Sequence, residues 1–342
     1  MHSMKKLIVF SLSLFLVAVS IAQEGTPYLT KSYKGVKRVR SSTAGGNISV
    51  TGGNVTEAKV DVYIRASQYN DKISNEEIRE RLEKDYDLVM ETQGDMLVLT
   101  AKSKKNNNWK NGLSISFYVV LPRAASTDLS TSGGNIILKN LEGKQDFTTS
   151  GGNLNLSDLK GDIKGRTSGG NINAEKLSED VDLVTSGGNV HVDQSKGNLK
   201  LSTSGGNVHL EDLDGTIDAS TSGGNVSGNN LKGEIDASTS GGNVELEKVS
   251  GSLKAGTSGG SLRVSMDAVN KYVKLNNSGG RIDLDLPSGK GYDLDIRGSK
   301  VKTSALTNYS GSVTEGRLNG KLNGGGSSIV VDNSGSVNLS FH

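Results

Sequence analysis

Along the middle of the chain, apolar and polar residues alternate with a period of two inside each copy of an 18-residue repeat. Every copy opens with the pentapeptide TSGGN or its variant TSGGS, and no insertion or deletion interrupts the series. Repetition at a short fixed period is typical of a solenoid, in which each unit buries its apolar residues by stacking on the next unit. We number the repeat from its threonine, and the eight copies begin at Thr131, Thr149, Thr167, Thr185, Thr203, Thr221, Thr239 and Thr257.

Two positions of the repeat predict its interior. Position fifteen is aliphatic in copies two to seven and holds Gln145 in the first copy. A spacing of two indicates a strand with one buried face, whereas a helix needs spacings of three and four. Each copy is therefore predicted to hold two short strands, at about positions five to nine and fourteen to one of the next copy. Position six is aliphatic in all eight copies: Ile136, Leu154, Ile172, Val190, Val208, Val226, Val244 and Leu262.

Glycines predict where the strands turn. We expect one corner at Gly-Gly-Asn and a second at the glycine in position thirteen, because glycine reaches positive φ without a steric penalty. Stacked coils then place each residue directly over its counterpart in the next copy, about 4.8 Å away. The predicted fold is all-β: a single-stranded parallel β-solenoid (β-helix) with 18-residue coils, plus one flanking amphipathic helix near the N-terminus.

Stacking would also align exposed side chains in columns. Position sixteen alternates in charge over five copies, from Asp146 to Asp218, as expected if like charges about 5 Å apart repel. A chance pattern on a solvated face is the alternative. Asparagine at position five of seven copies predicts a ladder of stacked amides that hydrogen-bond from rung to rung. A row of ligand donors is the alternative interpretation of the asparagine column.

The chain divides into four parts. They are residues 1–22 as a signal peptide, 23–130 as N-terminal strands, helix and cap, 131–276 as the regular solenoid, and 277–342 as irregular C-terminal coils and cap. Residues 42–54 carry two Gly-Gly-Asn motifs and are interpreted as a degenerate first coil. Further strands are predicted at 60–66, 96–101, 113–121 and within 277–286 and 322–342, whereas 301–321 is irregular.

A capping box predicts the helix. Ser74 occupies the cap and Glu77 stands three residues later. The helix is expected to close near Gly94 and to cover the end or flank of the solenoid, where strand edges would otherwise be unpaired. Docking on a partner is the alternative. Its apolar face would hold Ile78, Leu82, Tyr86 and Val89.

The N-terminus predicts export. Lys5 and Lys6 precede the apolar run Leu7 to Val19, and Ser20-Ile21-Ala22 is a cleavage site of the small-x-small type. The destination would be the periplasm, the cell surface or the extracellular medium. No later segment is apolar enough to span a bilayer. Loss of two lysines with the signal leaves 37 of the 39 basic residues against 37 acidic ones, so charge favours neither nucleic acid nor anionic membrane.

Candidate chemistry is sparse. The chain has no cysteine and four histidines, so a Ser–His–acid or Cys–His arrangement has little material, and we expect no catalytic residues, metal or cofactor. Trp109 lies in the polar loop 102–112 and is a candidate platform for a sugar, or a residue that packs back on its own strands. His191 and His209 both occupy position seven, would stack one rung apart and are further candidate ligand contacts. An exposed polar column without a metal is expected, because zinc needs three or four ligands.

The coils from Gly45 to His342, the strand ending in Val120-Leu121-Pro122 and the closing NGGGSSIVVDNSGSVNLSF resemble the bacterial putative-adhesin families, domains of unknown function in exported proteins. This resemblance implies an all-β solenoid outside the cytoplasm. The predicted function is a non-enzymatic structural or adhesive module that presents repeated side chains to a cell-envelope or host glycan or protein. A polysaccharide-acting enzyme on a β-helix is the alternative, and it would need clustered acids that break the repeat on one face.

Overall fold

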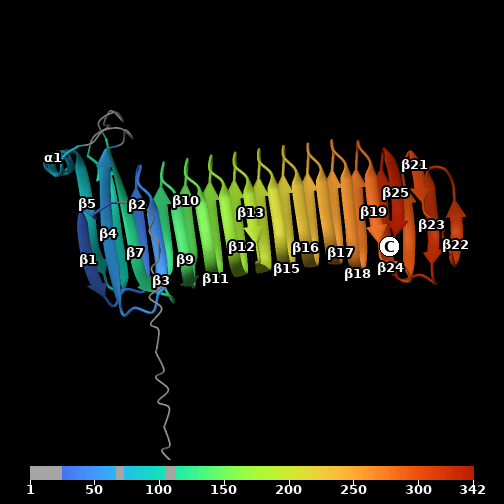
Figure 1. Cartoon of the computed structure of the whole chain (residues 1–342), viewed down its shortest axis with the longest axis horizontal. Helices are drawn as coiled ribbons and strands as arrows, with labels where there is room; N and C mark the ends of the chain where they lie inside the picture. The colour runs from blue at the N-terminus through green and yellow to red at the C-terminus, as the bar shows by residue number, and fades with distance from the viewer. Residues whose placement is uncertain (1–24, 67–72, 105–111) are drawn as a thin grey trace, which may run out of the picture.

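The computed structural model describes residues 25–66, 73–104 and 112–342. Within them, 25 strands form one continuous sheet that winds into a long rod (Figure 1). The helix is α1 (Asn75–Asp85). The strands are β1 (Leu29–Lys34), β2 (Arg38–Thr43), β3 (Ile48–Gly53), β4 (Glu57–Ala66), β5 (Tyr86–Gln93), β6 (Met96–Ser103), β7 (Leu113–Pro122), β8 (Ser126–Thr131), β9 (Ile136–Glu142), β10 (Gln145–Thr149), β11 (Leu154–Thr167), β12 (Ile172–Thr185), β13 (Val190–Asp193), β14 (Lys196–Thr203), β15 (Val208–Thr221), β16 (Val226–Thr239), β17 (Val244–Thr257), β18 (Leu262–Asn277), β19 (Ile282–Leu286), β20 (Tyr292–Arg297), β21 (Lys300–Thr303), β22 (Tyr309–Val313), β23 (Arg317–Leu322), β24 (Ser327–Asn333) and β25 (Ser336–Phe341).

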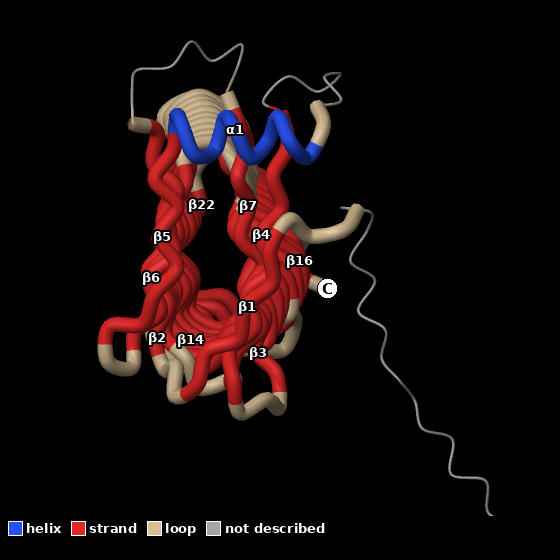
Figure 2. The backbone as a smooth tube through the Cα atoms, turned by 90° about the vertical axis from the view of Figure 1, so that its left-hand side faces the viewer, coloured by secondary structure: helices blue, strands red, loops and turns tan. Residues whose placement is uncertain are grey.

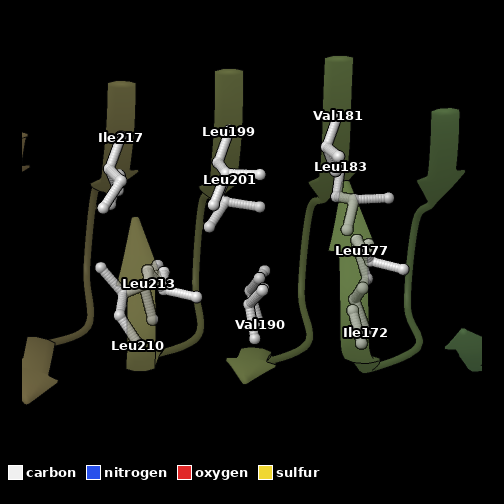
Figure 3. Packing of buried hydrophobic residues seen from close by; sticks show 14 of the residues in the cluster. Ile172, Leu177, Val181, Leu183, Val190, Leu199, Leu201, Leu210, Leu213 and Ile217 are labelled. Carbon is white, nitrogen blue, oxygen red and sulfur yellow. The ribbon is translucent and has the colours of Figure 1, made fainter. Parts of the chain in front are cut away.

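Neighbouring coils pair in parallel and in register. Leu154 lies opposite Ile172, and Val208 lies opposite Val226, so that paired residues are 18 apart in the chain. Val208 and Val226 are both fully buried. Figure 3 shows the consequence for the interior, where aliphatic side chains of successive coils lie one above another, such as Leu199 beside Ile217. The predicted solenoid interior is therefore present, and antiparallel packing of the repeats is excluded.

The polar exception in the core is satisfied by hydrogen bonds. Gln145 is fully buried; its Oε1 accepts a bond from the Thr127 hydroxyl at 2.7 Å, and its Nε2 donates to the Ala125 carbonyl at 2.9 Å. A buried amide left without partners would cost free energy. Gln145 thus replaces the aliphatic residue of this column at the first regular copy, where the coil meets the N-terminal part.

The predicted degenerate first coil is confirmed. β2 pairs in parallel with β8, and β3 pairs in parallel with β9, so residues 38–53 occupy the place of one more coil. Beyond it, β6 and β7 add one further parallel layer. The last strands at this end run the other way: β4 pairs antiparallel with β7 and β5 pairs antiparallel with β6. Figure 2 shows α1 lying across this end of the rod, beside the stacked loops.

The helix is shorter than predicted. Ser74 caps it as expected, since the backbone N–H of Glu77 donates to the Ser74 hydroxyl at 3.2 Å. The helix ends at Asp85, and both Tyr86 and Val89 lie in β5 instead. Gly94 is at φ 65° in the tight turn between β5 and β6, not at a helix terminus. Because residues 86–93 can pair with β6 along their whole length, strand pairing takes precedence over continuation of the helical period.

The C-terminal end also reverses the strand direction. β19 and β25 continue one face in parallel, and β24 continues the other beside β18. Residues 301–321, interpreted from the sequence as irregular, contain the end of β21 and most of the hairpin β22–β23, which pairs antiparallel. β23 in turn pairs antiparallel with β20. Antiparallel strands thus terminate the coil at both ends of the rod.

Of the two predicted corners, the glycine at position thirteen has the expected positive φ, whereas the Gly-Gly corner does not. None of the Gly-Gly corner residues of the regular copies has positive φ; the second glycine is needed for space, because an added Cβ would lie 1.8 to 2.1 Å from the carbonyl oxygen of the corresponding glycine in the preceding coil. The glycines at position thirteen do have positive φ, from 114° to 154°. An additional bend was not predicted: position ten is left-handed, with φ from 48° to 56°, in Asn140, Asp158, Lys176, Gln194, Asp212, Asn230 and Lys248.

Candidate functional site

The TSGGN corner (positions one to five of each repeat) is built from three buried or backbone-directed contacts. In the copy that starts at Thr203, the threonine hydroxyl donates to the Gly188 carbonyl of the preceding coil at 2.8 Å and accepts from the Gly206 N–H at 3.2 Å. Thr203 is 5% exposed. The threonines therefore support the corner from inside and do not form an exposed hydroxyl ladder.

The predicted asparagine ladder exists, with a different chemistry. The side-chain oxygen of Asn207 accepts from the backbone N–H of Asn225 at 2.8 Å, and Asn225 accepts in the same way from Asn243. Each amide thus bonds to the main chain of the next coil and not to the next amide. Because this column is used to hold neighbouring corners together, its alternative interpretation as a row of ligand donors loses support.

A column of serines remains on the outside of this corner. Position two is serine in all eight copies, and each of these residues is exposed. Their hydroxyl groups have no hydrogen-bond partner among the described residues, in contrast to the buried threonines beside them. The column consists of Ser132, Ser150, Ser168, Ser186, Ser204, Ser222, Ser240 and Ser258.

His191 and His209 stack as expected from their shared repeat position. Their ring centroids are 5.0 Å apart and their planes differ by 9°. Nδ1 of His209 lies 2.9 Å from the Ser227 hydroxyl, and its Nε2 lies 3.8 Å from a carboxylate oxygen of Glu211. The described residues hold no group of three or more His, Cys, Asp or Glu side chains arranged to bind a metal ion. The pair thus forms a column on the face of positions seven and nine, with His209 exposed and His191 half-buried.

The opposite face carries the alternating charges, and their predicted stacking is confirmed. Asp146 lies opposite Lys164, Lys164 opposite Asp182, and Asp182 opposite Lys200. The Lys254 ammonium lies 2.6 Å from Asp236 of the preceding coil. This hydrogen bond and the attraction of the Asp236 charge raise the pKa of Lys254 above its usual 10.5. This ion pair joins two coils beyond the five that alternate; within those five, Lys164 pairs with Asp162 of its own coil and Asp182 with Arg166 of the preceding coil.

A concavity of about 450 Å³ on this charged face gathers several aspartates. It is the arrangement in which a polysaccharide-cleaving acid and base would be sought. Two of its four aspartates form ion pairs, Asp162 with Lys164 at 3.0 Å and Asp182 with Arg166 at 3.1 Å, whereas Asp218 has no hydrogen-bond or ion-pair partner among the described residues. Asp180 accepts a bond from the Asn198 amide at 2.7 Å. An acid and base pair would need two available carboxylates, and Asp218 is the one aspartate of this concavity that lacks a partner among the described residues.

Two sequence predictions lie outside the described residues. Trp109 belongs to the segment 105–111, and the predicted signal peptide belongs to 1–24.

Across the described ranges, no helix has the length and apolar character needed to cross a membrane. The histidine column was predicted from the repeat, whereas the aspartate concavity, which lies along the predicted column of position sixteen, was not singled out from the sequence.

These features define the molecule as an all-β rod of stacked parallel coils with exposed side-chain columns. Residues 233–340 match the model of the Toastrack DUF4097 family, which confirms over that segment the resemblance to an adhesin-like family of unknown function. No curated protein matches the chain.

Two solved structures are similar to the chain. One is described as a putative cell adhesion protein from Clostridium sporogenes; it is 12% identical, with 92% of this chain and 98% of that chain covered and a TM-score of 0.19. The other is described as a putative adhesin from Bacteroides fragilis; it is 13% identical, with 92% and 96% covered and a TM-score of 0.26.

Proposed function

We propose that this protein is an exported, non-enzymatic adhesive rod that binds a repetitive partner of the cell envelope or of a host surface. The observation that carries the proposal is the register of the coils. Residues 18 apart, such as Val208 and Val226, lie opposite each other, so each exposed column contains one residue from every coil. A rigid array of this kind holds many weak contact groups at constant spacing. A polymer with repeated units can engage several of them at once, so that their contributions combine.

The Toastrack match supports an adhesin-like role without naming a ligand. Three of the four aspartates of the concavity are engaged by neighbouring side chains, which supports the non-enzymatic part of the proposal. Export rests on the sequence of residues 1–22, with cleavage after Ala22. Fractionation of native cells, followed by N-terminal sequencing of the recovered protein, should locate it outside the cytoplasm with Gln23 as its first residue. A full-length chain in the cytoplasm would contradict the proposed export.

Multivalent binding has a specific signature. The purified mature chain should be applied to surfaces that carry bacterial and host glycans, and purified envelope fragments, at low and high density. We expect apparent affinity to rise by at least about tenfold with density, because a second contact on the same rod becomes intramolecular. A density-independent affinity would contradict display along the rod.

The enzyme alternative is tested on the same glycans. Reducing ends and unsaturated products should be followed during long incubation with the mature chain. We expect none above the level of a heat-treated sample. Turnover would overturn the non-enzymatic proposal and would direct attention to the aspartate concavity, where Asp162→Asn and Asp182→Asn should then abolish it.

A further inference from the structure

Two tyrosines at the N-terminal end differ from the others that the structure describes. Elsewhere the phenol groups are engaged: five of them form hydrogen bonds, and Tyr118 has contacts of its own. Tyr28 and Tyr63 are the two whose hydroxyl groups have no hydrogen-bond partner among the residues that the structure describes. The five hydrogen-bonded residues are Tyr33, Tyr86, Tyr272, Tyr292 and Tyr309.

Tyr28 immediately precedes β1, and Tyr63 lies in the neighbouring strand β4. β1 pairs antiparallel with β4, with Leu29 opposite Val62, and the N–H of Tyr28 donates to the Val62 carbonyl at 2.8 Å. Continuing this register places Tyr28 next to Tyr63, on the same face of the sheet. The Tyr63 ring also meets Tyr118 of β7 edge-to-face, with centroids 5.0 Å apart and planes at 71°. Tyr63 is thus held by an aromatic neighbour, while Tyr28 stays 36% exposed.

A concavity of about 530 Å³ opens at these two rings. The chain segment before β1, the end of β4 and the first turn of α1 line it, so three separate elements converge there. Its wall combines the two aromatic side chains with Arg65, Asn75, Thr26 and Ile78. The volume lies in the range of small-molecule sites, about 300 to 1,000 Å³, and the lining joins aromatic surface to a few polar groups.

We propose that this concavity, the tyrosine site, binds one saccharide ring of a glycan. A sugar ring has an apolar C–H face, which matches an aromatic ring, and a rim of hydroxyl groups, which needs donors and acceptors. Tyr28 and Tyr63 offer both in one side chain, a ring and an unpaired hydroxyl, and Asn75 adds an amide at the rim. The inference rests on the proposed adhesive function and assigns it a site at the end of the rod, away from the repeated columns.

The experiment uses the mature full-length chain on a glycan array, followed by titration calorimetry with the mono- or disaccharide that ends the strongest ligand. We expect Tyr63→Ala to weaken that binding by at least tenfold, because ring and hydroxyl are lost together. Tyr28→Phe and Tyr63→Phe keep the rings and should weaken it by about threefold to tenfold, as expected for one lost hydrogen bond. Circular dichroism and thermal melting confirm that each variant is folded.

Tyr272→Phe is the matched control. It also removes a tyrosine hydroxyl, but that group bonds to Glu234 on β16, far along the rod, so its glycan affinity should equal that of the unchanged chain. If glycans bind and Tyr28→Phe, Tyr63→Phe and Tyr63→Ala all retain full affinity, the tyrosine site is wrong and the proposed adhesive function stands. If the unchanged chain binds no glycan on the array, the tyrosine site is overturned, and protein or peptide partners of the rod become the remaining test of the adhesive function.

Discussion

The two corners of one coil reach the same result, a reversal of the chain, by different physical means. The TSGGN corner is held by specific contacts with the coil below: a buried threonine hydroxyl, a glycine pressed against a carbonyl and an asparagine bonded to a backbone N–H. The second corner (positions ten to thirteen) depends on backbone conformation, with a left-handed residue followed by a glycine at high positive φ. The first corner therefore requires particular side chains, whereas the second requires particular dihedral angles.

This difference explains the variation among copies. The TSGGN corner is almost identical in all eight, because a change in any of its contacts also affects the neighbouring coil. Position ten instead accepts Asn, Asp, Lys and Gln, all of which adopt left-handed backbone here. Asparagine and aspartate tolerate this region best. A left-handed residue at position ten costs a small amount of free energy within its own coil. A Cβ at the second glycine of the TSGGN corner would instead overlap the neighbouring coil, and this cannot be relieved without moving that coil.

The strongest test of the comparison is a pair of adjacent glycines. Gly206→Ala would place a Cβ 2.0 Å from the Gly188 carbonyl oxygen, which forces neighbouring coils apart. We expect a loss of about 3 kcal/mol or more in the free energy of unfolding. Gly205→Ala is the matched control, since its Cβ would meet the nearest atom at an ordinary 3.5 Å. Chemical denaturation followed by circular dichroism measures both; equal effects would show that corner glycines are not set by the spacing between coils.

A smaller loss is expected at the threonine of the same corner. Thr203→Val keeps the shape of the side chain but leaves the Gly188 carbonyl and the Gly206 N–H without their partner. An unsatisfied buried group costs about 1 to 3 kcal/mol. Ser204→Ala, one residue further on, removes a hydroxyl with no partner and should change stability by less than about 0.5 kcal/mol. A shift of similar size in both melting curves would refute the assigned role of Thr203.

Much of this architecture could be predicted from the repeat. The period fixed which residues stack, and the aliphatic residues at positions six and fifteen marked the interior. The bend at position ten could not be predicted, because lysine or glutamine there carries no sign of left-handed backbone. The predicted length of α1 was wrong for a related reason. Tyr86 and Val89 fit a helical face as well as a strand, and only the pairing of β5 with β6 shows that they belong to a strand.

The tyrosine site could not be predicted from the sequence either. Tyr28 and Tyr63 are separated by 34 other residues and share no motif, and only the antiparallel pairing of β1 with β4 brings them together. The sequence instead drew attention to Trp109, which lies outside the described residues. Repeats predict contacts between equivalent positions, whereas sites at the ends of a solenoid depend on strands that occur once.

At the second corner, replacing one residue should increase the stability of the protein. Glu179 occupies position thirteen, where most copies have glycine, and its φ is 81°. A left-handed conformation costs a non-glycine residue roughly 1 to 2 kcal/mol, so we expect Glu179→Gly to stabilise the protein by about 1 kcal/mol. The lost pairing with Lys160, 3.5 Å away and exposed, contributes little. Glu175→Gly in the same strand, where φ is not positive, should instead destabilise; thermal melting of the two variants should move in opposite directions.

The smallest effect is expected on the charged face that joins the two corners. Because hydrogen bonding to Asp236 raises the pKa of folded Lys254 above 10.5, the pair stabilises the fold at lower pH and loses this contribution as the pH rises through the folded pKa. Both side chains are about half exposed, which keeps the contribution small. Lys254→Met should therefore lower the melting temperature slightly at pH 8, with the difference from the unchanged chain narrowing above pH 10.5. A difference that stays constant to higher pH would mean that packing of the lysine stem, and not its charge, joins these coils.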